Sequence, residues 1–153
     1  MRWLECVERV DIERPSAVVF ELISSVDRWP GWLAGITDLE RTSSATSGLG
    51  AAFTGRYRMF PGATYDLACE VTVYEPIRRA GRRTMCGPLV FEATQTLEPT
   101  SDGGTLLLNE LRVGSPRRAM SWMLRLSAPL ARRRIAKEAR AELQRIKHAA
   151  EAT

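Results

Sequence analysis

A proline-led helical segment within residues 10–32 constrains the fold of this chain more than any other stretch. Apolar and polar residues alternate over residues 3–13, which predicts a strand with one buried face. Pro15 then fits the first turn of a helix, where a missing N–H costs nothing, and apolar residues follow at helical spacing. A second short helix is expected around Trp29 and Trp32. A strand followed directly by two short helices is an uncommon order, so it restricts the candidate folds.

The middle of the chain predicts an antiparallel sheet. Alternating runs, rich in β-branched and aromatic residues, are separated by glycine and proline turns. Short connections favour pairing between strands that follow one another. The expected strands are Ile36–Ser43, Ala51–Met59, Thr64–Tyr74, Arg79–Met85, Leu89–Glu98 and Thr105–Val113.

Residues 115–150 predict a long helical stretch that ends the chain. Small and apolar residues recur there at steps of three or four, which places them on one face of a helix. Pro129 lies inside the stretch, removes a backbone donor and crowds the preceding turn. We therefore expect a kink or break near Arg125–Ala128.

Composition indicates one ordinary globular domain spanning residues 1–153. Hydrophobic residues make up 44% and charged residues 26% of the chain, which argues against global disorder. The first residues lack the apolar run of a signal peptide, and no uncharged segment approaches the ~20 residues of a membrane-spanning helix. We therefore expect a cytoplasmic protein.

Few residues point to catalysis or to a metal. The three cysteines are widely spaced and the one histidine, His148, is near the C-terminal end, so no zinc site, disulfide framework or cysteine nucleophile is expected. No phosphate-binding loop or dinucleotide fingerprint occurs, and we expect no cofactor and no metal. If the protein were an enzyme, the candidate acid–base groups would be Tyr57, Tyr65 and Glu8. We assign no catalytic residue.

The complete order of elements resembles the helix-grip superfamily of START and pollen-allergen-like proteins (SRPBCC), which includes the polyketide cyclase/dehydrase and lipid-transport family. The stretches that carry the resemblance are Pro15–Trp32, Gly50–Phe53, Glu70–Arg79, Phe91–Thr105 and the final helix. It implies an α+β helix-grip fold: a curved seven-stranded antiparallel sheet wrapped round a long C-terminal helix, with two short helices between strands one and two. It also implies a ligand cavity between the sheet and that helix.

Side-chain alternation predicts which residues would line such a cavity. Two polar residues, Gln95 and Asn109, fall on otherwise apolar inner faces, and a hairpin turning at Ser101–Gly103 places them opposite each other. A buried amide without a partner costs about 1–3 kcal/mol, so each amide needs the other, an ordered water or a ligand. The expected lining is Phe53, Tyr57, Tyr65, Leu67, Cys69, Val71, Phe91, Gln95, Asn109, Leu111, Met120, Met123, Leu124, Ala128, Ala131 and Ile135.

Two readings of this lining remain open. Alanines in the middle of the last helix leave volume opposite a concave sheet, but large side chains such as Phe53, Tyr57 and Phe91 could fill it. Met120 and Met123 suit a cavity mouth or lid, and they suit ordinary helix packing equally well.

The last helix is strongly basic, and the net charge of the chain is +4. Arg132–Arg134 point in different directions round the helix, and Glu138 and Glu142 are spaced to pair with Arg134 and Arg145. We favour the interpretation that the basic face of this helix is solvated. Peripheral contact with an anionic membrane is the alternative, and binding of nucleic acid is disfavoured.

Three classes of function remain. The favoured one is a carrier or sensor that binds a small hydrophobic molecule, such as a lipid, quinone or polyketide, as a monomer or weak homodimer. The second is a polyketide cyclase or dehydratase that uses the same cavity, an analogy that rests on the resemblance alone. The third is a toxin-like or other protein-interaction module, which would be expected to expose an apolar patch.

Overall fold

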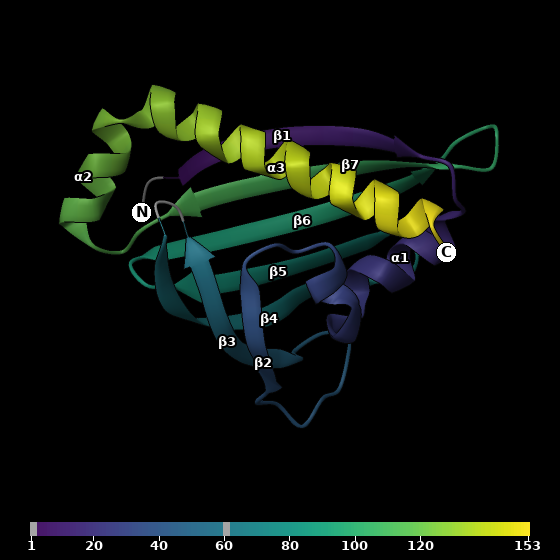
Figure 1. Cartoon of the computed structure of the whole chain (residues 1–153), viewed down its shortest axis with the longest axis horizontal. Coiled ribbons are helices and arrows are strands. Elements are labelled where there is room, and N and C mark those ends of the chain that lie inside the picture. The colour runs from purple at the N-terminus through teal and green to yellow at the C-terminus, as the bar shows by residue number, and fades with distance from the viewer. Residues whose placement is uncertain (1–2, 60–61) are drawn as a thin grey trace.

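A seven-stranded antiparallel sheet and one long helix define the architecture (Figure 1). The computed structural model describes residues 3–59 and 62–153. Its elements are β1 (Trp3–Ile12), α1 (Ser16–Ser24), the 3₁₀ helix η1 (Val26–Gly31), β2 (Ile36–Arg41), β3 (Ala52–Met59), β4 (Ala63–Glu75), β5 (Arg79–Cys86), β6 (Leu89–Pro99), β7 (Thr105–Gly114), α2 (Arg118–Leu126) and α3 (Ala128–Glu151). The predicted helix-grip fold is confirmed.

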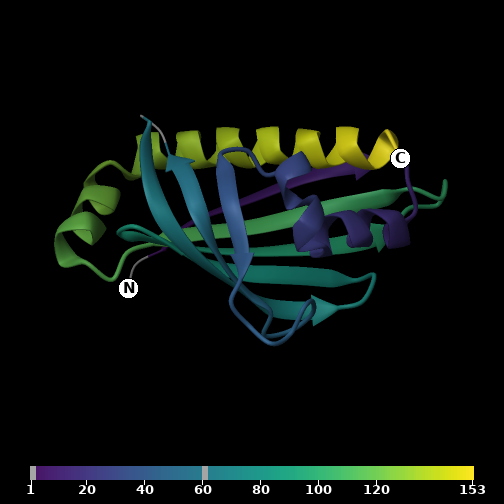
Figure 2. The same ribbon diagram turned by 60° about the horizontal axis from the view of Figure 1, so that its bottom comes forward.

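The strand order β1-β7-β6-β5-β4-β3-β2 makes β1 and β2 the two edges of the sheet. From β2 to β7 the strands form the expected meander. Strand β1 pairs with β7, and the chain then crosses through the two short helices to β2 at the opposite edge. Helix α3 lies across one face of the curved sheet, with α1 beside its C-terminal end (Figure 2). We call the face of the sheet that α3 crosses the concave face.

The predicted break in the last helical stretch is confirmed at Ser127. Ser127 ends α2, and both its backbone N–H and its hydroxyl bond to the carbonyl of Met123. Pro129 occupies the first turn of α3, where its missing donor breaks no hydrogen bond. The proline therefore begins a new helix instead of interrupting one.

The main core lies where α3 and α1 meet the sheet. Leu143 and Ile146 of α3 are fully buried against residues of α1 and the sheet, such as Val19 and Leu107. Trp29 and Trp32 belong to this core, since both are buried and both indole N–H groups donate to carbonyls of α1. The two short helices are therefore anchored by packing and by hydrogen bonds.

Two local predictions were wrong. Glu142 does not pair with Arg145 but with Arg82 on β5, because the inner face of α3 turns Glu142 toward the sheet. Arg145 instead donates to the carbonyl oxygen of Trp32. Aspartate is favoured at N-cap positions, so Asp27 is the residue that the sequence offers as the cap of η1; Ser25 occupies the N-cap instead, without a side-chain hydrogen bond, and Asp27 lies in the first turn.

Candidate functional site

A row of polar side chains crosses the concave face from the β1 edge. The strand register pairs Glu8 with Asn109, Asn109 with Gln95, and Gln95 with Ala80. The predicted juxtaposition of Gln95 and Asn109 is therefore confirmed. Glu8 is bound by Arg140 of α3 at 3.1 Å, so α3 covers the row at its edge.

Each of the two amides in this row has an atom without a partner. Gln95 and Asn109 are 1% and 2% exposed, and no hydrogen bond reaches Gln95 Nε2 or Asn109 Oδ1. One atom is a donor and the other an acceptor, so a group that accepts and donates at once, such as a hydroxyl or water, could satisfy both. The sequence holds only one other side-chain amide, Gln144, which is exposed.

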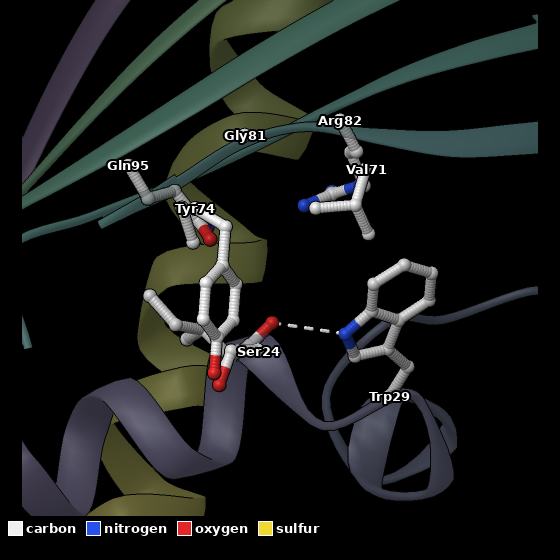
Figure 3. A pocket seen from close by; sticks show the side chains of 9 residues that line it. Ser24, Trp29, Val71, Tyr74, Gly81, Arg82 and Gln95 are labelled. Atoms are coloured by element: carbon white, nitrogen blue, oxygen red, sulfur yellow. Dashed lines mark hydrogen bonds between the residues drawn. The ribbon is translucent and has the colours of Figure 1, made fainter. Parts of the chain in front are cut away.

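A small hollow adjoins Gln95 beneath α1 and η1 (Figure 3). Only about 10 Å³ is open to the centre of a water molecule, which is room for one water. Its lining is Ile23, Ser24, Trp29, Val71, Tyr74, Ala80, Gly81, Arg82 and Gln95. Val71 and Gln95 are the two predicted lining residues among these.

Arg82 is a residue of the candidate site that was not predicted from the sequence. Its guanidinium lies 3.4 Å from a carboxylate oxygen of Glu142. The guanidinium carbon also lies over the rings of Trp29 and Trp32, 5.6 and 5.4 Å from the ring centres. The side chains of Arg82 and Glu142 are only 13% and 18% exposed. Alternation from Ala80 places Arg82 on the inner face, so the signal was present in the strand.

The sixteen predicted lining residues fall into three groups by burial. Six are buried in the concave face: Phe53, Leu67, Cys69, Val71, Gln95 and Asn109. Nine are half-buried, at the end of the concave face near α2 or on the helices there: Tyr57, Tyr65, Phe91, Leu111, Met120, Leu124, Ala128, Ala131 and Ile135. Met123 is 61% exposed on the outer side of α2. The half-buried group marks where the concave face is incompletely covered.

Burial keeps two polar groups of the concave face in their neutral forms. Burial, together with the nearby carboxylates of Glu142 and Glu138, raises the pKa of Tyr57 above its ordinary range. Burial likewise raises the pKa of the Cys69 thiol, which also accepts a hydrogen bond from Thr84. At neutral pH Tyr57 is therefore a hydrogen-bond donor, and Cys69 is a thiol of low reactivity.

A larger hollow of about 720 Å³ lies on the opposite face of the sheet, over β2 to β5. It is open to solvent, and its charged pair, Arg56 and Asp66, is 59% and 93% exposed. No unpartnered buried polar atom of the described residues lies there. The concave face is the better candidate site.

The chain belongs to the polyketide cyclase / dehydrase and lipid transport family, whose model matches residues 4–151. No curated protein matches the sequence significantly.

Solved structures share the fold at low sequence identity. The crystal structure of Ara h 8.0201 matches at a TM-score of 0.71 with 12% identity, covering 99% of this chain and 100% of the other. TTHA0849 from Thermus thermophilus matches at 0.75 with 15% identity, covering 97% of each chain. The di-domain ARO/CYC StfQ from the steffimycin biosynthetic pathway matches at 0.77 with 13% identity, covering 98% of this chain and 51% of that one.

None of the helices in the described residues is long and apolar enough to cross a membrane.

Proposed function

We propose that this protein binds a small, mainly apolar molecule between the concave face and α3, as a carrier or sensor. The observation that carries the proposal is the pair of unpartnered amide atoms, Gln95 Nε2 and Asn109 Oδ1, on residues that lie opposite each other in the sheet. An unsatisfied buried amide costs about 1–3 kcal/mol; a bound hydroxyl would satisfy both atoms, and a carbonyl would satisfy Gln95 Nε2 alone. Apolar walls with few polar groups are typical of small-molecule sites.

The incompletely covered end of the concave face supports a proposed length for the ligand. Phe91 is half-buried and lies four residues from Gln95 on the same strand, a separation of about 13 Å. A ligand of that length would place its polar end at Gln95 and Asn109 and its apolar body against Phe91, with Ile135 of α3 above it. Lipids, quinones and polyketides all include molecules of this kind.

Native mass spectrometry of the freshly purified chain tests the proposal. We expect a bound compound that carries a hydroxyl or carbonyl, and we expect the double variant Q95L/N109L to lose it. The matched control is Q144L, which removes the exposed amide and should retain the compound. An unoccupied wild-type chain, with no thermal stabilisation by a fatty alcohol, a quinone or an aromatic polyketide, would refute the proposal and favour an interaction module instead.

A second candidate is a cyclase or dehydratase reaction on such a molecule. The part-buried Arg82–Glu142 pair beside the hollow favours it, because a carboxylate and a guanidinium could move a proton and stabilise negative charge. Incubating the extracted compound with wild type and with E142Q distinguishes the two candidates. If the protein is a carrier, both wild type and E142Q return the compound unchanged. If it is an enzyme, wild type converts the compound and E142Q does not.

A further inference from the structure

A large apolar surface is exposed on α2 and the first turn of α3. Trp122, Met123 and Leu126 are 58%, 61% and 78% exposed, and Leu130 is 71% exposed. We call these four residues the α2 surface. No residue of α2 is fully buried. Single exposed apolar residues are ordinary, but four within nine positions form a patch of the kind that marks an interaction site.

Helix geometry separates this patch from the face of α2 that the fold uses. At about 100° per residue, Trp122, Leu126 and Met123 share an arc of about 100°. Met120 and Leu124 lie on the other side of the helix and are half-buried. Helix α2 therefore has two apolar faces, and only the inner one packs against the rest of the chain.

The segment that carries the α2 surface contains charges of a single sign, although Arg112 at its start pairs with Glu92 of β6. Residues 111–137 contain no aspartate or glutamate. Arg118 and Arg125 lie at one edge of the apolar arc, and the Arg125 guanidinium lies 5.3 Å from the centre of the Trp122 ring. The basic residues of the segment are Arg112, Arg117, Arg118, Arg125, Arg132, Arg133, Arg134 and Lys137.

The position of α2 makes this surface accessible to a flat partner. Helix α2 extends past the end of the sheet, at the opposite end of the molecule from the C-terminus (Figures 1 and 2). An aromatic and aliphatic face bordered by arginines is the pattern of a helix that lies in a membrane interface. Nucleic acid would also meet the positive charge, but it offers little to three exposed aliphatic side chains.

We propose that the α2 surface binds an anionic lipid bilayer. Trp122, Met123, Leu126 and Leu130 enter the boundary between headgroups and acyl chains, and the flanking arginines contact the lipid phosphates. This docking would bring the incompletely covered end of the concave face, with Met120 and Leu124, to the bilayer surface. The proposal does not depend on what the concave face binds, because it rests on exposed residues alone.

Co-sedimentation of the full chain with vesicles tests it. We expect binding to vesicles of phosphatidylcholine mixed with phosphatidylglycerol, little binding to phosphatidylcholine alone, and weaker binding at high salt. W122S/L126S should lower the partition constant about tenfold or more. R118E/R125E should lower it at least about fivefold for each arginine. Circular dichroism and urea unfolding would show that each variant still folds.

Matched controls place the effect on α2. L49S/M85S changes two equally exposed apolar residues elsewhere, and R9E/R41E makes the same charge change on the strands. The apolar control should bind like wild type, and the charge control should lose no more than about twofold.

Four results would overturn the proposal. They are equal binding to neutral and anionic vesicles, unchanged binding by W122S/L126S, preferential binding of a single-stranded RNA homopolymer that anionic vesicles do not displace, and self-association by light scattering that W122S/L126S abolishes. The third would assign the surface to nucleic acid and the fourth to a second copy of the chain.

Discussion

The two halves of α3 meet the rest of the molecule differently. In the C-terminal half, Leu143, Ile146 and Ala150 are fully buried against α1 and the sheet. In the N-terminal half, Ala131 and Ile135 are only half-buried. The same helix therefore closes the core at one end and leaves the concave face incompletely covered at the other. Stability is thereby assigned to the C-terminal end of α3, and the proposed binding to its N-terminal end.

The largest expected effect contrasts the two ends directly. Leu143→Ala should lower the free energy of unfolding by about 3 kcal/mol, because it leaves a cavity in the core. Leu130→Ala, at the exposed end, should change it by less than about 0.5 kcal/mol. Urea unfolding measures both. Similar losses for the two variants would contradict the division of α3.

The Arg82–Glu142 pair joins the closed part of α3 to β5, and breaking it should cost less. Arg82→Met is expected to destabilise the chain by about 2 kcal/mol, because the carboxylate of Glu142 is left part-buried without its partner. Replacing both residues, as R82M/E142L, should recover most of the loss. If the double variant is as unstable as R82M, the packing of Arg82 over Trp29 and Trp32 is what matters.

Asn109→Leu should act in the opposite direction. In the ligand-free chain it removes a buried acceptor that has no partner, so we expect stability to stay unchanged or to rise by about 1 kcal/mol. Q144L is the control, since it changes an exposed amide. Thermal and urea unfolding of the stripped proteins measure the difference. A loss of more than about 1 kcal/mol would indicate that Asn109 is needed for the fold.

The smallest effect is a pH dependence from the buried thiols. Because burial raises the pKa of Cys69, the folded state holds its proton longer than the unfolded state. Stability is therefore constant below the unfolded pKa of about 8.5 and falls as the pH rises above it. Cys69→Ala should reduce the decline between pH 8 and 9 by no more than about 0.7 kcal/mol. Cys6, half-buried, should react with a thiol reagent faster than Cys69.

Sequence patterns predicted the secondary structure and the strand register, because each of these patterns depends on local chemistry. Alternation and glycine–proline turns located the strands, Pro129 located the break between α2 and α3, and hairpin register placed Gln95 opposite Asn109. The predicted lining residues could be assigned to faces of strands and helices. How far α3 covers those residues depends on where the helix lies across the sheet.

The hollow beneath α1 and η1 was not predicted, for a physical reason. Its walls come from α1, η1, β4, β5 and β6, so it depends on how two short helices dock, and no local pattern encodes that docking. Arg82 was not predicted because a strand with three arginines, at positions 79, 82 and 83, is typical of a solvent-exposed strand. The alternation of side chains that starts at Ala80 places Arg82 on the inner face instead.

The three side-chain amides allow the most direct test of the proposed binding site. A ¹H–¹⁵N correlation spectrum should show only three side-chain amide pairs, from Gln95, Asn109 and Gln144. They are compared in the chain as purified, after bound compounds are stripped on a hydrophobic resin, and after the organic extract is returned. The account predicts that Gln95 and Asn109 shift on stripping and return with the extract, while Gln144 stays unchanged. Constant positions for all three would contradict a ligand at these amides.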